Sequence, residues 1–214
     1  MPTGEYLLSD PHDGALLAVE RFRCAAGPVG WRYVATRHLP GTAGAAESVV
    51  GKIDVTVDAR WRQLRVEIAT GGWLVRGGLT ADGFAWVRRP EDGTGEVEEH
   101  VEAAAGFTMT SGGAAAFASP AFLVCAARFA ALAPEGQADL RLVGLTPPGL
   151  AATTIRQRWR LDGRTTHRSD DAEVLVDDFT VLDLDLGSGG PVHLAGDVVL
   201  AAPGVDLAEL AEPT

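Results

Sequence analysis

The chain has 214 residues, of which 46% are apolar and 22% charged, a balance typical of a folded globular protein that excludes disorder throughout. Its formal net charge of −11 repels phosphate backbones and anionic lipid surfaces, so we expect neither nucleic-acid binding nor docking on an acidic membrane. No stretch approaches the ~20 apolar residues of a membrane span, and Met1–Pro11 lacks the apolar core of a signal peptide. The sequence therefore predicts a cytoplasmic protein.

Apolar and polar residues alternate through much of the first half of the chain. Ile53, Val55 and Val57 alternate with polar residues, and residues 64–68 repeat the pattern. A period of two places one face of a strand on a core and the other in water, which is typical of an antiparallel sheet. The predicted strands of this part are residues 53–58, 64–68, 73–75 and 84–87, with turns at 58–60 and 81–83.

A different pattern marks the middle of the chain. Residues 90–96 form a polar loop, 97–110 a further strand, and the Gly- and Ala-rich residues 111–119 a flexible crossing. From Pro120 to Leu132 the apolar residues are dense and do not alternate. Ser119 as N-cap, Pro120 at the first helical position and Pro134 beyond the end favour a short helix, with a buried strand as the alternative.

The second half returns to alternating strands at residues 138–145, 155–161, 174–176, 181–186 and 192–200, with turns at 162–163 and 177–178. Residues 201–214 are expected to be a frayed tail or a short surface helix. The predicted fold is therefore mainly β. We expect a curled antiparallel sheet that forms a roll or half-barrel, with one short Ala-rich helix near residues 120–132. A single domain spans residues 1–214, with its core at about 15–200.

Motifs for catalysis, metal binding or cofactor binding do not emerge from the sequence. No Gly-x-Ser-x-Gly elbow and no phosphate-binding glycine loop occur, so we predict no catalytic residue and no cofactor. Asp10, His12 and Asp13 could contact a cation, but their setting is that of a turn, and we predict no metal site. Cys24 and Cys125, in small apolar surroundings, are expected to be buried thiols, with a disulfide as the alternative.

Tryptophans are the first candidates for a binding site, because all five fall on predicted strands. Their large faces either fill the core or, if the sheet stays partly open, line a groove for an apolar ligand. The sequence does not distinguish these two alternatives. The residues are Trp31, Trp61, Trp73, Trp86 and Trp159.

Arginines in rows along the predicted strands are a second candidate feature. Three flank the strand at residues 60–65 and three alternate along residues 156–160, with Arg164 and Arg168 following. Such rows form a solvated face paired with acidic neighbours, which we favour, or an anion-binding patch at a pocket mouth.

Two segments resemble a known family, the bacterial proteins named for glycolipid binding, whose curled sheet is similar to the LolA/LolB-type lipoprotein carriers. The first is the Val-x-Val-Asp-x-x-Trp pattern of residues 55–61. The second joins Ser119–Pro120 and Arg128 to a Pro-containing break at residues 145–150 and the strand Gln157–Trp159. The resemblance implies a curled antiparallel sheet and a lipid or glycolipid ligand, and it adds Arg128 and Gln157 to the candidate ligand-binding residues. Phe122–Cys125 replaces the family's polar stretch, so the matching parts are scaffold.

The function predicted from these observations is that of a binding protein, a carrier or sensor, for an apolar or amphipathic small molecule such as a lipid or glycolipid. One alternative is a protein-interaction or structural module that uses an exposed sheet face or edge, for example in a homo-oligomer. The other is an enzyme whose site is not visible in the sequence. A curled sheet without a positioned base or nucleophile suits binding better than catalysis.

Overall fold

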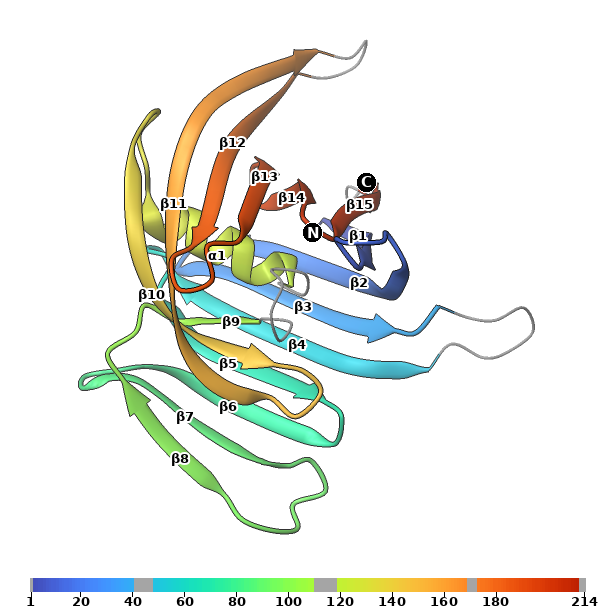
Figure 1. Ribbon diagram of the computed structural model, residues 1–214, viewed down its shortest axis with the longest axis vertical. Coiled ribbons are helices and arrows are strands. Elements are labelled where there is room, and N and C mark those ends of the chain that lie inside the picture. The colour runs from blue at the N-terminus through green and yellow to red at the C-terminus, as the bar shows by residue number, and fades with distance from the viewer. Residues whose placement is uncertain (1, 41–47, 110–118, 169–172, 212–214) are drawn as a thin grey trace.

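The computed structural model describes residues 2–40, 48–109, 119–168 and 173–211, and it confirms the mainly β fold. One 15-stranded sheet curls around α1 (Pro120–Ala130), the single helix of the described residues (Figure 1). The strands of the first half are β1 (Thr3–Ser9), β2 (Leu16–Gly27), β3 (Gly30–His38), β4 (Val49–Asp58), β5 (Gln63–Thr70), β6 (Trp73–Thr80), β7 (Gly83–Pro90) and β8 (Glu98–Glu102). Those of the second half are β9 (Phe107–Met109), β10 (Gln137–Thr146), β11 (Ala151–Arg168), β12 (Glu173–Asp183), β13 (Gly189–Ala195), β14 (Val198–Ala202) and β15 (Val205–Ala211).

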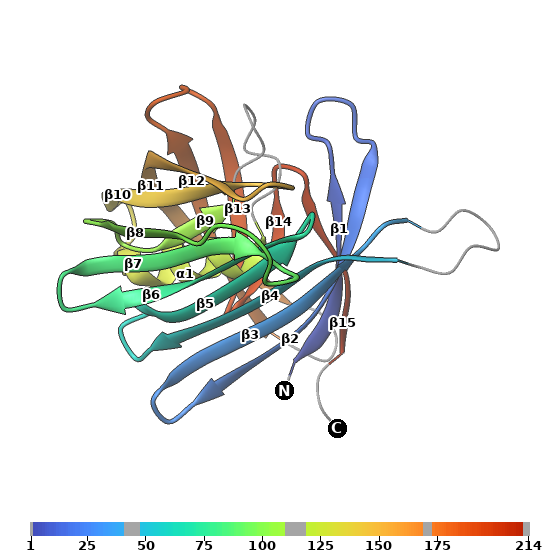
Figure 2. The same ribbon diagram turned by 90° about the horizontal axis from the view of Figure 1, so that it is seen from below.

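Neighbouring strands are antiparallel, except that the short β9 runs parallel to β10. The order in the sheet is β8-β7-β6-β5-β4-β3-β2-β1-β15-β14-β13-β12-β11-β10-β9. The first and last strands of the chain therefore pair in the middle of the sheet, with Thr3 opposite Ala211 (Figure 2). The prediction of a frayed tail or surface helix at residues 201–214 is wrong, because pairing with β1 holds residues 205–211 as a strand.

Because apolar and polar residues alternate along each strand, the apolar side chains of neighbouring strands form transverse rows on the inner face of the sheet. Phe22, Ala35, Ile53 and Ile68 lie side by side on β2 to β5, and all four are buried. Fully burying an aliphatic or Phe side chain is worth about 1.5–3 kcal/mol. The predicted strands of the first half are confirmed where they alternate, because burial of one face fixes their register.

The helix α1 lies inside the curl, and every residue from Pro120 to Ala127 is buried. Pro120 occupies the start of the helix, where a missing N–H is tolerated. Ala131, in the left-handed conformation with φ 48°, ends it. The helix prediction is confirmed and the alternative of a buried strand is wrong. A helix that is apolar on all sides fits here because sheet surrounds it.

Several local predictions are wrong. β11 and β12 run unbroken through the turns expected at residues 162–163 and 177–178. The strand expected at residues 97–110 is interrupted, since β8 ends at Glu102 and β9 begins at Phe107 on the other side of the sheet order. Trp61 lies in the turn between β4 and β5, not on a strand, and has φ 61°. Asp58 extends that turn, because its Oδ1 accepts the backbone N–H groups of Arg60 and Arg62, both at 2.9 Å.

The gap between β5 and β9 is bridged by one side chain. The Gln63 amide donates from Nε2 to the carbonyl oxygen of Phe107 at 3.0 Å and accepts the Phe107 N–H at 2.7 Å. A single amide thus makes the two hydrogen bonds that a paired strand residue would make. The Phe107 ring packs edge-on against Phe84 and Trp86 of β7, with centroids 4.6 and 5.5 Å away.

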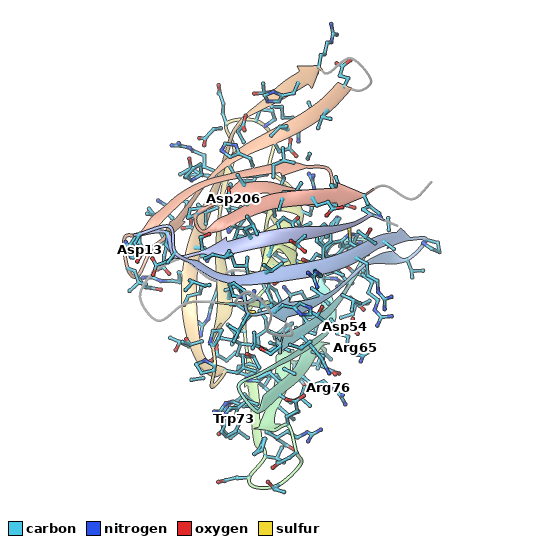
Figure 3. The ribbon with its side chains drawn as sticks, turned by 90° about the vertical axis from the view of Figure 1, so that its right-hand side faces the viewer. Asp13, Asp54, Arg65, Trp73, Arg76 and Asp206 are labelled. Atoms are coloured by element: carbon cyan, nitrogen blue, oxygen red, sulfur yellow. The ribbon has the colours of Figure 1, made fainter. Side chains whose placement is uncertain are left out.

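The outer face carries the arginines in ion pairs with acids of neighbouring strands, as predicted. Figure 3 shows Asp54, Arg65 and Arg76 together on this face. Arg32 contacts Asp54 at 2.7 Å, and Arg65 and Arg76 both contact Glu67. In the second half the same arrangement recurs as Arg156–Asp185, Arg158–Asp139 and Arg160–Asp162. Exposed pairs of this kind each contribute about 0–1 kcal/mol, so their main consequence is a solvated face.

Both cysteines are buried free thiols, which confirms the first of the two alternatives for them. Cys24 faces inward from β2 and Cys125 lies in the buried part of α1. Burial raises the pKa of the Cys24 thiol to about 11 and raises that of Cys125 further. Thiols held neutral in this way are poor nucleophiles.

Candidate functional site

One transverse row of the inner face departs from the apolar pattern. Glu20 on β2 lies opposite Arg37 on β3, Arg37 lies opposite Gly51 on β4, and Gly51 lies opposite Thr70 on β5. Glu20 is 0% exposed and Arg37 7%. A carboxylate and a guanidinium therefore occupy inward positions of strands whose other inward positions are apolar.

Three donors converge on the Glu20 carboxylate. Tyr33 donates from its hydroxyl to Oε1 at 2.6 Å, and Ser119 donates to the same oxygen at 2.9 Å. Arg37 donates from Nε to Oε2 at 2.7 Å. A buried carboxylate is tolerable when it is paired and hydrogen-bonded in this way. These four residues are called the Glu20 cluster below.

Ser119 connects the start of α1 to this carboxylate. It occupies the N-cap position in an extended conformation, but its side chain makes no capping hydrogen bond because the hydroxyl is directed to Glu20. The N-terminus of a helix carries partial positive charge, so a carboxylate beside it is favourable. The helix dipole and Arg37 thus both act on Glu20.

Arg37 retains a donor without an acceptor. Its Nη2 is buried and has no hydrogen-bond partner in the described parts of the chain. An unsatisfied buried donor costs about 1–3 kcal/mol, and folded proteins contain few of them. The Glu20 cluster therefore offers an inward-facing guanidinium N–H to an acceptor that the described residues do not supply.

The two tyrosines beside this carboxylate are held neutral. Burial raises the pKa of the Tyr33 phenol well above its ordinary value of 10.0, and the negative charge of Glu20 acts in the same direction. Tyr6, opposite Glu20 on β1, also has its pKa raised, chiefly by burial. Its hydroxyl accepts the backbone N–H of Val199 at 3.2 Å. Both phenols therefore act as neutral hydrogen-bonding groups.

A groove of about 390 Å³ lies at the ends of β4 and β5, and none of the four residues of the Glu20 cluster lines it. Gly51 and Thr70 line it, and a Cβ at position 51 would lie 3.5 Å from the Cβ of Arg37. Its volume lies within the roughly 300–1,000 Å³ of small-molecule sites. The rest of the lining combines small or apolar residues with two charged ones: Val49, Val50, Lys52, Ala69, Gly71, Gly72 and Glu91.

A second polar cluster lies at the other end of α1. Asp177 of β12 accepts Nη1 of Arg128 at 2.9 Å and Nε of Arg164 at 2.7 Å. Arg128 also donates from Nη2 to the carbonyl oxygen of Gly196, and its Nε lies 3.9 Å from Asp197. Arg128 is in the last turn of α1, where a cation complements the helix dipole. Arg128, Arg164 and Asp177 are called the Asp177 cluster below.

The predicted ligand-binding residues are distributed among several sites. Trp31 packs against Trp61, with ring centroids 5.3 Å apart, near the C-terminal half of α1. The pocket that Trp61 lines there holds about 10 Å³, room for about one water molecule. Trp86 stacks on His100 and packs against Phe107.

The remaining candidates lie apart from these. Trp73 shares the transverse row of Thr70 and carries the Arg88 guanidinium 3.6 Å above its ring. Trp159 is 0% exposed, and its indole N–H donates to Gln157 at 3.2 Å. Arg128 belongs to the Asp177 cluster. Of the predicted residues, Trp73 is the one that lies in line with the Glu20 cluster.

The sequence reasoning missed the Glu20 cluster altogether. A usable signal existed, because Glu20 follows Ala18 and precedes Phe22 at inward positions of β2, and Arg37 occupies the corresponding position of β3. A charged residue in phase with the apolar face of each of two consecutive strands indicates a buried ion pair. The link to Ser119, far along the chain, has no local signal.

In the segments that the structure covers, no group of His, Cys, Asp and Glu side chains is placed to hold a metal ion. The described chain also holds no helix with the length and hydropathy needed to cross a membrane.

Comparison with known proteins supports the fold and does not indicate a function. No family model matches the chain, and no curated protein matches it. A DUF1089 family protein from Pseudomonas aeruginosa has a similar structure, with 15% identity, 86% of this chain and 89% of that chain covered, and a TM-score of 0.51. A β-barrel-like DUF1849 protein from Brucella abortus covers 98% and 96%, with 11% identity and a TM-score of 0.47. The first likeness shows a shared fold.

Proposed function

We propose that this chain is a binding protein, a carrier or sensor, for an amphipathic small molecule whose polar end is held by the Glu20 cluster. The observation that carries the proposal is the Nη2 of Arg37, which is buried and has no acceptor within the described residues. A ligand oxygen at this position would offset the cost of the unsatisfied donor, about 1–3 kcal/mol.

The groove at the ends of β4 and β5 has room for the apolar part of a ligand. Val49, Val50 and Ala69 give it apolar lining, and Gly51, which also lines it, is the neighbour of Arg37 in the next strand. Sites for small molecules combine such walls with a few positioned polar groups. The resemblance of the sequence to the glycolipid-binding family, with its LolA-like curled sheet, favours a lipid or glycolipid as the class of ligand.

An enzymatic function has less support. The carboxylate of Glu20 is engaged by three donors, and the hydroxyl of Ser119, which is 0% exposed, is directed to it. Catalysis requires a base or nucleophile within reach of a substrate atom. Within the cluster, the group that lacks a partner is a donor, which suits recognition.

Native mass spectrometry with defined amphiphiles tests the proposal. We expect the full chain to retain at least one of three ten-carbon probes: monodecanoylglycerol, decanoate or decyl phosphate. Replacing the buried pair by Glu20→Gln with Arg37→Met should abolish retention, because it removes the donor without leaving an unpaired charge. The matched control is Asp139→Asn with Arg158→Met, which removes an exposed ion pair and should bind as the wild type does. The proposal fails if the wild type retains none of the probes, or if the Glu20/Arg37 variant retains them equally.

A further inference from the structure

We infer that the polar group received by the Glu20 cluster is uncharged, a hydroxyl or carbonyl oxygen, and not a carboxylate or phosphate. The inference rests on the proposed binding function and concerns the same site. It follows from the balance of charge and hydrogen bonds around Arg37.

The first step is the charge of the cluster. Glu20 and Arg37 form a buried ion pair at 2.7 Å, with side chains 0% and 9% exposed. Tyr33 is neutral, since burial keeps its phenol protonated, and Ser119 carries no charge. The guanidinium is therefore already neutralised by a carboxylate within the protein.

The second step concerns the helix dipole. The N-terminus of α1 is the other source of positive potential at this site. Its N-cap residue, Ser119, already contacts the Glu20 carboxylate at 2.9 Å. The partial charge of the helix is thus also directed to an anion that the chain supplies.

The third step compares two kinds of ligand. An anion would bring a second negative charge into a buried site whose positive charge is already paired, so its desolvation would be poorly compensated. A neutral oxygen would accept the free N–H of Arg37 at a much lower desolvation cost. The unpaired group is one donor and not an unpaired charge, so a neutral acceptor is its complement.

The groove at the ends of β4 and β5 favours neither sign of charge. Its two charged lining residues, Lys52 and Glu91, have opposite signs. Sites for anions instead gather donors of one sign around the ligand. The ligand class that fits is therefore an amphiphile with a hydroxylated or ester head, such as a monoacylglycerol or an alkyl glycoside.

Dissociation constants of the same three probes test the inference. At neutral pH we expect the wild type to bind monodecanoylglycerol at least about tenfold more tightly than decanoate or decyl phosphate, measured by titration calorimetry. Glu20→Gln leaves the Arg37 charge unpaired and should reverse the preference toward the two anions. The control Asp139→Asn should leave the preference unchanged, because Asp139 lies on the outer face.

The outcomes separate the two proposals. Tighter binding of either anion to the wild type would overturn the neutral-head inference while supporting the binding function. Equal affinities that Glu20→Gln does not change would overturn it as well. If Glu20→Gln does not fold, as judged by circular dichroism, the wild-type ranking decides the inference. Failure of all three probes to bind would refute both proposals.

Discussion

The two ends of α1 carry polar clusters of similar composition and different completeness. At the C-terminal end, Arg128 reaches Asp177 and the carbonyl oxygen of Gly196, and Arg164 completes the pairing of the same aspartate. At the N-terminal end, Glu20 is saturated but Arg37 has a donor to spare. A polar cluster whose groups are satisfied fixes a helix in place, whereas one with a free buried donor is suited to receive a ligand.

Exposure adds to the contrast. In the Asp177 cluster the side chains of Arg128 and Arg164 are 24% and 43% exposed, so both guanidinium groups remain partly hydrated. The Glu20 pair is almost completely removed from water. Breaking the first cluster should therefore cost less than breaking the second.

The largest effect is expected from Arg37→Met. This change leaves the Glu20 carboxylate buried without its cation, and we expect the free energy of unfolding to fall by about 3–5 kcal/mol. Urea denaturation followed by tryptophan fluorescence measures it. Adding Glu20→Gln should recover most of the loss, since no buried charge then remains. If Arg37→Met lowered the free energy of unfolding by less than about 1 kcal/mol, the prediction would be wrong, because a loss of that size is typical of an exposed ion pair.

A smaller effect is expected from Asp177→Asn. The change removes the charge that Arg128 and Arg164 share, and hydrogen bonds to charged groups contribute about 1.5–3 kcal/mol, a value reduced here because both arginines are partly exposed. We expect a loss of about 1–2 kcal/mol in the same denaturation assay. Retention of monodecanoylglycerol should not change. If it were lost, the Asp177 cluster would be part of the binding site.

The smallest effect on stability is expected from the two tyrosines, which affect it only at high pH. Tyr6 and Tyr33, the two tyrosines of the chain, both have raised pKa values in the fold. Unfolding returns each phenol to its ordinary value of 10.0, so stability is complete below about pH 10 and declines as the pH rises above it. Absorbance of tyrosinate should therefore appear only with unfolding. Ionisation near pH 10 in the folded protein, with circular dichroism unchanged, would contradict the burial of the Glu20 cluster.

Local pattern was enough to predict most of the fold. Alternation defined the strands around Ile53 and Val66, and Ser119–Pro120 with Pro134 defined the helix, because these signals depend on neighbours in sequence. The turn at Trp61 was misplaced because the hydrogen bonds of Asp58 extend it past the residues that look like a turn. The last strand was missed since its Ala- and acid-rich residues are ordered by pairing with β1.

The candidate site was less predictable than the fold. Glu20 and Arg37 are marked by their phase in two consecutive strands, but another member of the cluster, Ser119, lies 99 residues from Glu20. Tryptophans were chosen for their chemistry, and the fold distributes them over separate contacts. Which polar groups meet inside a curled sheet depends on the crossing of strands, and that is a property of the whole chain.

The amide of Gln63 holds β9 against β5. Between β5 and β9 the wall of the curl is joined by the two hydrogen bonds of one side chain and by ring contacts, with no backbone pairing. Separating the wall along this line breaks far fewer bonds than separating paired strands such as β4 and β5. This join beside α1 should therefore part at a lower cost than a paired strand, and the backbone pairing of the sheet would stay intact.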